Sequence, residues 1–388
     1  MSPSIRFPEF TGEWERCVLG DVLEFSNTRI NSSELNSGNY VSTENILQNF
    51  QGIVKARSIP EDTNVMAFSC GNILLSNIRP YLKKVWKATF NGGCSSDVFV
   101  LQANSNIDAD YLHYVVANDK FIGFVMNGAK GVKMPRGDKN QMKTYSLSLP
   151  SIKEQRKISR FLSFLDERSA VQSRLIDRLQ SLMIGLNNSL YEQYGNDITT
   201  SFMELGYSYS GLSGKSAKDF GSGKPFITYL NVYSNIIVDE TDYQYVRIND
   251  GEKQNIVRTG DVLFTLSSET PEEVGIGSVY LGEKEVYLNS FCFGIHIERN
   301  QLAYSPYLSY YVTSTAFRKF IYPFAQGSTR FNLCKADFEK ASIKLPSLDN
   351  QKRISAMLDC IAEKIRAEKA ILEYYNIQRQ YLLRQMFI

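Results

Sequence analysis

The chain has 388 residues, of which 43% are hydrophobic and 22% are charged, and its formal net charge is +2. This composition excludes an intrinsically disordered chain and leaves room for two or three domains with cores of their own. A nearly neutral charge neither indicates nor excludes nucleic acid as a partner, so a DNA-binding face would have to be built locally.

Targeting and metal-binding signals are weak. No basic and apolar leader opens the sequence, and its apolar runs fall short of the roughly 20 residues that cross a membrane, so we expect a cytoplasmic protein. The 6 cysteines form no Cys-x-x-Cys pair, and only 2 histidines are present, which argues against a zinc site.

Catalytic motifs are incomplete. Gly214-Lys215-Ser216 ends like a phosphate-binding loop, but Tyr209 stands where its first glycine belongs. The pair Gly275 and Gly277 lacks the third glycine of a dinucleotide fingerprint, and no Pro-Pro of an adenine-methyltransferase motif occurs. His113 and His296 have no serine, cysteine or acidic partner at a telling spacing, so His296 is interpreted as a core residue. We therefore expect no catalytic residue, no metal and no cofactor on this chain.

The first 150 residues are predicted to form a mixed α/β domain. The expected elements, in chain order, are a short strand or helix at 14–25, strands at 40–42, 53–54, 71–76 and 98–101, and a helix that opens at 108.

A basic stretch at 77–87 follows one of these strands and interleaves Tyr81 and Trp86 with four cations. Such cations could neutralise DNA phosphates. The alternative is a solvated loop whose aromatic rings pack inward. The cations are Arg79, Lys83, Lys84 and Lys87.

A polar, glycine-containing loop follows the helix in each half and is the second candidate for DNA contact. Arg and Lys can pair with guanine and Asn with adenine, while Ser and Thr can serve bases or phosphates. The alternative is an ordinary polar loop. The candidates are Lys130, Lys133, Arg136 and Lys139 in the first half, and Ser328, Thr329, Arg330, Asn332 and Lys335 in the second; Ser267 occupies the turn that corresponds to the basic stretch.

A long helix is predicted over 151–196. It opens with Leu-Pro-Ser-Ile-Lys-Glu-Gln-Arg-Lys-Ile, in which Ser151 can cap the helix and Glu154 can complete a capping box. Apolar residues then recur at fours and threes, as in a coiled-coil seam. The seam positions are Ile158, Leu162, Leu165, Ser169, Gln172, Ile176, Leu179, Met183, Leu186 and Leu190.

The same pattern returns 196 residues later, where Pro-Ser-Leu opens a second long helix. The offset is 189 at the strands of 71–76 and 260–265, and 186 near Leu19 and Leu205. This predicts a tandem duplication of α+β (mixed α/β) character. Its expected parts are a first domain at 1–150, a helix at 151–196, a second domain at 197–346 and a helix at 347–388.

The two helices are predicted to form an antiparallel coiled coil in which Gln172 and Glu368 meet near the middle. Apolar residues off the seam would remain uncovered and are predicted to bind partner helices. The predicted coil and partner interface consists of Phe161, Leu165, Gln172, Leu175, Leu179, Leu182, Met357, Ile361, Glu368, Ile371, Tyr374 and Tyr381, with Phe164 also off the seam.

These features together resemble the specificity subunit of bacterial type I restriction-modification enzymes. The resemblance rests on the duplicated domain, both helix openings, the Asn-Ile-Arg-Pro turn at 77–80 and the Gly-rich loops. It implies two target-recognition domains, each reading one half of a bipartite DNA site, separated by a coil that acts as spacer and docks two methyltransferase subunits, with motor-nuclease subunits joining them. S-adenosylmethionine, ATP and Mg are then implied on the partner subunits. The alternatives are a DNA-modifying or DNA-cleaving enzyme with an unrecognised site and a coiled-coil scaffold that binds only protein.

Overall fold

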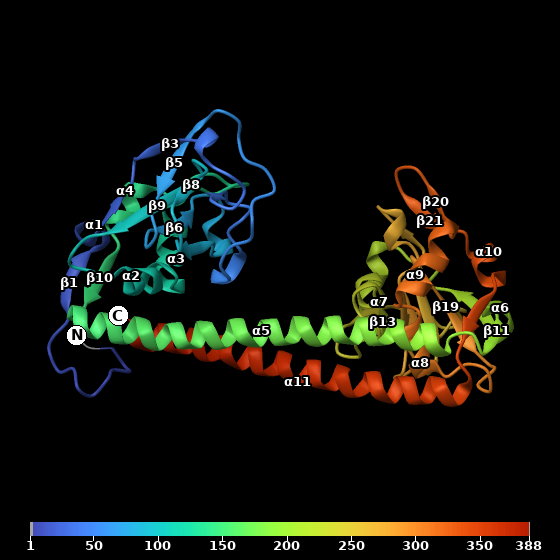
Figure 1. Cartoon of the computed structure of the whole chain (residues 1–388). Helices are drawn as coiled ribbons and strands as arrows, with labels where there is room; N and C mark the ends of the chain where they lie inside the picture. Colours follow the sequence, from blue (N-terminus) through green and yellow to red (C-terminus); the bar gives the residue numbers. More distant parts are fainter. Residues whose placement is uncertain (1–2, 388) are drawn as a thin grey trace. The chain divides into compact units, whose positions relative to one another are not determined.

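The computed structural model describes residues 3–387, and its contacts divide the chain into two compact units. Unit 1 combines Met1–Ser173 with Ala370–Ile388, and unit 2 is Arg174–Lys369. The long helices α5 (Ile152–Tyr194) and α11 (Leu348–Met386) each run from one unit into the other. Each unit therefore holds one α/β domain and a part of both helices (Figure 1).

The domain of unit 1 contains two four-stranded sheets, in which all neighbouring strands are antiparallel except β4 and β8. The strand order is β2-β9-β6-β7 in one and β3-β5-β8-β4 in the other. The strands and helices before α5 are β1 (Glu15–Val18), α1 (Leu19–Val22), β2 (Leu23–Phe25), β3 (Arg29–Asn31), β4 (Tyr40–Val41), β5 (Asn64–Phe68), β6 (Ile73–Ser76), β7 (Val85–Lys87), β8 (Gly92–Cys94), β9 (Val98–Ala103), α2 (Ala109–Val116), α3 (Asp119–Asn127), α4 (Lys139–Lys143) and β10 (Ser146–Leu149).

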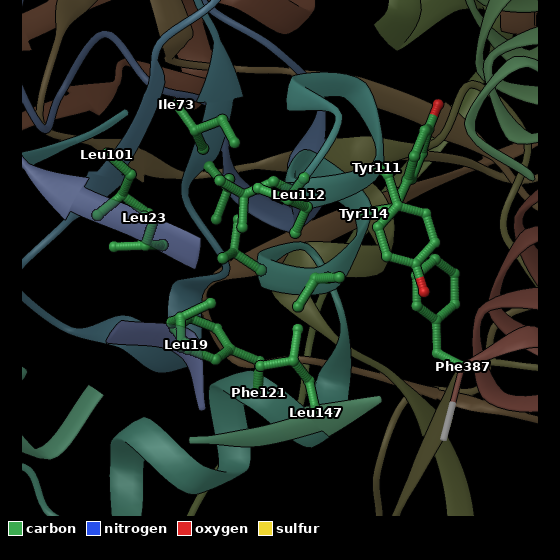
Figure 2. Close-up of a cluster of buried hydrophobic side chains, with 14 of the residues drawn as sticks. Leu19, Leu23, Ile73, Leu101, Tyr111, Leu112, Tyr114, Phe121, Leu147 and Phe387 are labelled. Carbon is green, nitrogen blue, oxygen red and sulfur yellow. The ribbon is translucent and has the colours of Figure 1, made fainter. Parts of the chain in front are cut away.

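The core of this domain lies between the β2-β9-β6-β7 sheet and helices α2 and α3. Ile73 and Leu101, paired across β6 and β9, share it with Leu112 and Phe121 (Figure 2). All four side chains are buried. The central strands are buried on both faces, because Leu74 and Val100 belong to a second apolar cluster on the side away from α2.

Unit 2 repeats this plan. Its four-stranded sheet has the order β12-β19-β15-β17, which matches β2-β9-β6-β7 position for position. The strands and helices between α5 and α11 are β11 (Ile198–Thr200), α6 (Phe202–Leu205), β12 (Gly206–Ser210), β13 (Phe220–Ile227), α7 (Tyr229–Ser234), β14 (Tyr243–Val246), β15 (Val262–Thr265), β16 (Ser267–Ser268), β17 (Gly277–Val279), β18 (Tyr287–Leu288), β19 (Cys292–Ile297), α8 (Ser305–Tyr311), α9 (Thr315–Ile321), β20 (Ala325–Gly327), β21 (Phe331–Leu333), α10 (Lys335–Lys340) and β22 (Ile343–Leu345).

The two long helices are antiparallel in each unit taken by itself. In unit 1 the beginning of α5, with Ile158 and Leu162, shares a core with Leu382 and Met386 near the end of α11. In unit 2 the end of α5, with Met183, Leu186 and Leu190, packs on the core that holds Ile354 and Leu358 from the beginning of α11. The predicted antiparallel pairing of the helices is confirmed, and the predicted seam positions at both ends of the helices lie in these cores. Gln172 and Glu368 are both buried, but they belong to different units, and their contact stays a prediction.

The start of α5 differs from the prediction in one detail. The Glu154 backbone N–H donates to Ser151 Oγ at 3.4 Å, as a cap requires. The buried Glu154 carboxylate does not turn back to complete the capping box. It accepts instead from Arg6 Nε at 2.7 Å and Trp14 Nε1 at 3.3 Å, because these long-range donors satisfy a buried charge better than one backbone N–H.

Candidate nucleic-acid interface

In unit 1 the two loops singled out in the sequence lie side by side. Ile78 bridges Arg136, and Arg136 bridges Lys130 on its other side, so the three residues form one cross-strand row. We call this the unit 1 row. Residues that pair directly across antiparallel strands present their side chains on the same face. Arg136 and Lys130 are both exposed, and Lys130 Nζ donates to Asp138 Oδ2 at 2.8 Å while 81% of its side chain remains exposed.

The unit 1 row is fixed by backbone hydrogen bonds from the Asn-Ile-Arg-Pro turn. Arg79 N donates to Pro135 O at 2.8 Å, and Gly137 N donates to Asn77 O at 3.0 Å. The Arg136 guanidinium also contacts Asp97, with Nη2 3.3 Å from Oδ1, yet 54% of the Arg136 side chain remains exposed. An ion pair this exposed contributes little stability and leaves the outer edge of the guanidinium available.

In unit 2 the corresponding loops form a short three-stranded sheet, β16-β21-β20. Ser267 pairs with Asn332, and Asn332 pairs with Gln326, which gives a second cross-strand row, the unit 2 row. Asn332 and Gln326 are exposed. Gly327 closes the hairpin with a φ of 145°, in the region that favours glycine, and a Cβ there would lie 2.1 Å from Arg330 O.

The two rows occupy the same positions of the internal repeat. Lys130 and Gln326 are 196 residues apart, as are Arg136 and Asn332, while Ile78 and Ser267 follow the offset of 189 that holds for the preceding strand. Gln326 was not among the residues predicted from the sequence. The sequence indicates Gln326 only through its offset of 196 residues from Lys130. That offset becomes informative once the pairing of the hairpin strands is known.

The basic stretch at 77–87 is largely engaged within unit 1. Lys83 Nζ lies 2.7 Å from Asp119 Oδ1, and Lys87 pairs with Asp110. Lys84 Nζ donates to Thr43 O at 2.5 Å, and burial lowers its pKa. Trp86 is buried and Tyr81 is 48% exposed, so only one of the two aromatic rings packs inward.

Two predicted lysines at matching positions lie over aromatic rings of the central sheets. Lys139 Nζ is 5.3 Å from the centre of the Phe99 ring on β9, and Lys335 Nζ is 5.0 Å from that of Phe293 on β19. Cation–π contact of this kind holds an ammonium group in place. Lys335 Nζ also lies 3.6 Å from Glu339 Oε1. The remaining predicted residues, Lys133, Ser328, Thr329 and Arg330, are exposed in the two loops.

Charged groups surround both rows. Ser268, the neighbour of Ser267 in β16, donates to Glu273 Oε2 at 3.0 Å, and a hydrogen bond from Tyr233 followed by that from Ser268 lowers the pKa of Glu273. In unit 1, Asp97 and Asp138 pair with Arg136 and Lys130 of the row itself. Exposed basic residues are also present at both rows, namely Lys133 and Arg79 in unit 1 and Arg330 in unit 2.

His296 has an acidic partner that sequence spacing did not reveal. Its Nδ1 lies 2.6 Å from Asp261 Oδ1, and Tyr209 Oη donates to the other carboxylate oxygen at 2.7 Å. All three residues are buried, and the Tyr209 ring stacks on the imidazole. The interpretation of His296 as a satisfied core residue fits this network. Its acidic partner, Asp261, directly precedes β15 and is 35 residues away in the sequence, so spacing alone did not indicate it.

The long helices expose the apolar residues that lie off the seam. Phe164 is 51% exposed, Leu182 56% and Tyr374 70%, and Phe161, Leu175, Met357, Ile371 and Tyr381 are exposed as well. By contrast, Leu165 and Ile176 of the seam are buried.

Within residues 3–387, no helix is long and apolar enough to cross a membrane. The same part of the chain holds no group of three or more His, Cys, Asp or Glu residues placed to bind a metal ion.

The fold defines an internally duplicated α+β protein with two α/β domains and a pair of antiparallel helices. The sequence matches the family described as the type I restriction modification DNA specificity domain over residues 11–181 and 212–374, and the chain belongs to this family.

Similar proteins agree with this assignment. The specificity subunit of the type I restriction enzyme EcoDI of Escherichia coli is 33% identical over 93 residues, which is 24% of this chain and only 20% of that protein. A chain from a structure of the type I R-M system, described in terms of complex assembly and conformational transition, has a TM-score of 0.60 at 20% identity. The alignment covers 96% of this chain and 97% of that chain. The type I S subunit from M. genitalium has a TM-score of 0.55 at 15% identity and covers 100% and 99%. At these identities the structures show a shared fold.

Proposed function

We propose that this chain is the DNA sequence-recognition subunit of a type I restriction-modification complex. Each α/β domain reads one half of a bipartite, asymmetric site on double-stranded DNA. The observation that carries the proposal is the pair of exposed cross-strand rows at equivalent positions of a duplicated domain with different side chains. Recognition of an asymmetric two-part site requires two domains with similar folds and different side chains on the surface that contacts DNA.

The methyl transfer and any cleavage are assigned to partner subunits. The exposed apolar residues of α5 and α11 are assigned to docking of two methyltransferase subunits, because large apolar side chains such as Leu182 and Tyr374 are costly to leave in water on a helix surface. Motor-nuclease subunits would join that assembly. S-adenosylmethionine, ATP and Mg would bind on those partners, in the cytoplasm.

A domain exchange tests this function. Residues 1–150 are replaced by the first domain of another member of the family, and the methylated sites of the host genome are read by sequencing. We expect one half of the methylated site to change while the other half stays the same. A site that is unchanged in both halves would exclude the proposed role.

A further inference from the structure

We propose that the two rows determine which base each domain reads, the unit 1 row taking guanine through Arg136 and Lys130 and the unit 2 row taking adenine through Asn332 and Gln326. This inference rests on the proposed function and adds the class of base recognised by each domain.

The backbone frame of the two rows is the same. Asn77 N donates to Asp97 O at 2.8 Å, and Leu266 N donates to Phe291 O at 2.8 Å at the equivalent place. On the far side, Leu333 N donates to Leu266 O at 2.9 Å, which reproduces the bond between Gly137 and Asn77. Side chains on the two rows therefore start from equivalent backbone positions, and what differs is their chemistry.

The hydrogen-bonding groups of the rows suit different bases. Arg136 and Lys130 carry only donors, which match the two acceptors, O6 and N7, on the major-groove edge of guanine. Asn332 and Gln326 each carry a donor and an acceptor, which match N7 and the N6 amino group of adenine. The amide pair is uncharged, so attraction to a phosphate does not explain its exposure.

The neighbours of each row fit the same assignment. Asp97 holds the Arg136 guanidinium from one side, which orients it while its other edge stays exposed. The residue at the equivalent backbone position in unit 2 is Phe291, whose side chain is 59% exposed. An exposed apolar ring is suited to the methyl group of thymine, the base that pairs with adenine.

Selection of DNA from a randomised duplex library tests the inference. The full-length chain is tagged and purified from its own cells with the subunits that remain bound, and the enriched duplexes are sequenced. The Asn332→Arg variant should change one position of one half-site from adenine to guanine, by about 5- to 150-fold in relative enrichment, the discrimination of one bidentate contact. The reciprocal Arg136→Asn variant should lower the preference for guanine in the other half-site.

The matched control is Asn300→Arg, which adds the same charge to an exposed position of unit 2 after the opposite end of β19. It should leave the enriched sequence unchanged. Since all three substitutions are at exposed positions, thermal unfolding should stay at the wild-type temperature; should Asn332→Arg fail to fold, Gln326→Lys replaces it. An enriched sequence that neither row variant alters would overturn this inference and leave the proposed function standing. If the wild-type complex enriched no sequence, the proposed function would fall too.

Discussion

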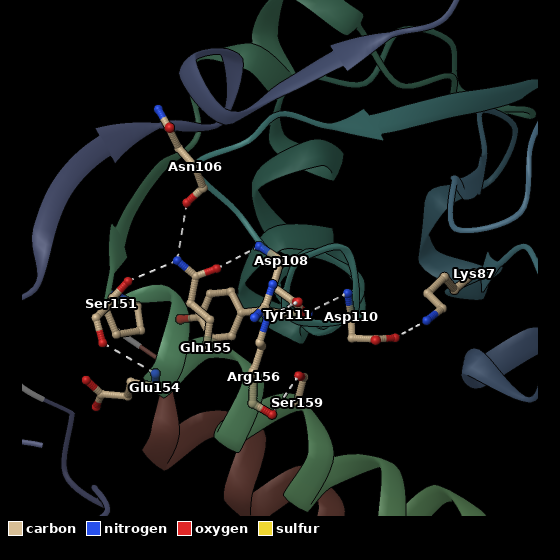
Figure 3. Close-up of polar contacts among 11 residues, drawn as sticks. Lys87, Asn106, Asp108, Asp110, Tyr111, Ser151, Glu154, Gln155, Arg156 and Ser159 are labelled. Atoms are coloured by element: carbon tan, nitrogen blue, oxygen red, sulfur yellow. Dashed lines mark hydrogen bonds and ion pairs between the residues drawn. The ribbon is translucent and has the colours of Figure 1, made fainter. Parts of the chain in front are cut away.

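Gln155 and Gln351, 196 residues apart, make the same three hydrogen bonds in the two halves of the molecule. Gln155 Oε1 accepts from Asp108 N at 2.8 Å, and Gln351 Oε1 accepts from Tyr304 N at 2.8 Å. Gln155 Nε2 donates to Pro150 O before α5 and to Asn106 O before α2 (Figure 3). Gln351 Nε2 donates likewise to Pro346 O before α11 and to Leu302 O before α8. Both glutamines are buried. They fasten each α/β domain to the first turn of a long helix.

Replacing either glutamine by leucine is therefore expected to destabilise its own unit. The Gln155→Leu variant leaves the partly buried N–H of Asp108 and two carbonyls without that partner, at a cost of about 1–3 kcal/mol. Calorimetry of the full chain should show a lower unfolding temperature for one transition only. Gln378→Leu, at an exposed position of α11, is the control and should change stability by less than about 0.5 kcal/mol. Equal effects of the two variants would contradict this account.

The duplication and the helices could be predicted because their signals are local or periodic. The seam of Ile158, Leu162 and Leu165 follows from spacing alone, and the offset of 196 relates it to Ile354 and Leu358. The glutamine contacts could not be predicted, because they depend on where backbone groups of a distant loop come to lie. A buried Gln155 looks like any other polar helix residue in the sequence.

The candidate interface was only partly predictable for the same reason. Lys130, Arg136 and Asn332 were named from composition, but their rows arise from long-range pairing, which also brings in Gln326. Composition likewise did not show that Lys84 is directed to Thr43 O. The sequence alone does not indicate where the ammonium group of a loop lysine will lie.

The difference between engaged and exposed lysines can be tested by salt dependence. Lys133 is exposed in the hairpin of unit 1, so Lys133→Ala should weaken DNA binding for all sequences alike and reduce the slope of log affinity against log salt by about 1. Lys84→Ala should leave the slope unchanged, because its Nζ already donates to Thr43 O. Binding of labelled duplex by the purified complex between about 50 and 200 mM salt measures both. The same slope for both variants would refute the assignment of Lys133 to a phosphate.

The exposed apolar residues of the helices predict a loss of affinity for the methyltransferase subunit when one of them is removed. Tyr374→Ser should weaken binding of the methyltransferase subunit by about 10-fold or more, as truncation of an aromatic anchor does in other interfaces, without lowering the unfolding temperature. Tyr245→Ser removes an aromatic ring of 49% exposure from β14, off the helices, and should leave that binding unchanged. Titration of the methyltransferase subunit in surface-bound assays measures the two affinities. A larger effect at Tyr245 would move the docking site away from the helices.

His113 on α2 predicts a dependence of stability on pH. Its Nδ1 is enclosed and makes no hydrogen bond among the residues that the structure describes, and burial lowers its pKa to about 4. The unfolded chain has a histidine pKa of about 6.5, so between about pH 6.5 and pH 4 the unfolded chain takes up a proton that the folded chain refuses. This contribution to stability is present above pH 6.5 and is lost as the pH falls through that window.

The variant His113→Phe removes the titrating group from the same helix position. Its unfolding temperature relative to the wild type should rise as the pH is lowered from 7 to 5, because groups common to both chains cancel in the difference. Calorimetric scans of the full chain at pH 7, 6 and 5 measure this. Parallel curves for the two chains would mean that folded His113 takes up its proton as readily as the unfolded chain does. The enclosure of its Nδ1 would then have no effect on the proton equilibrium.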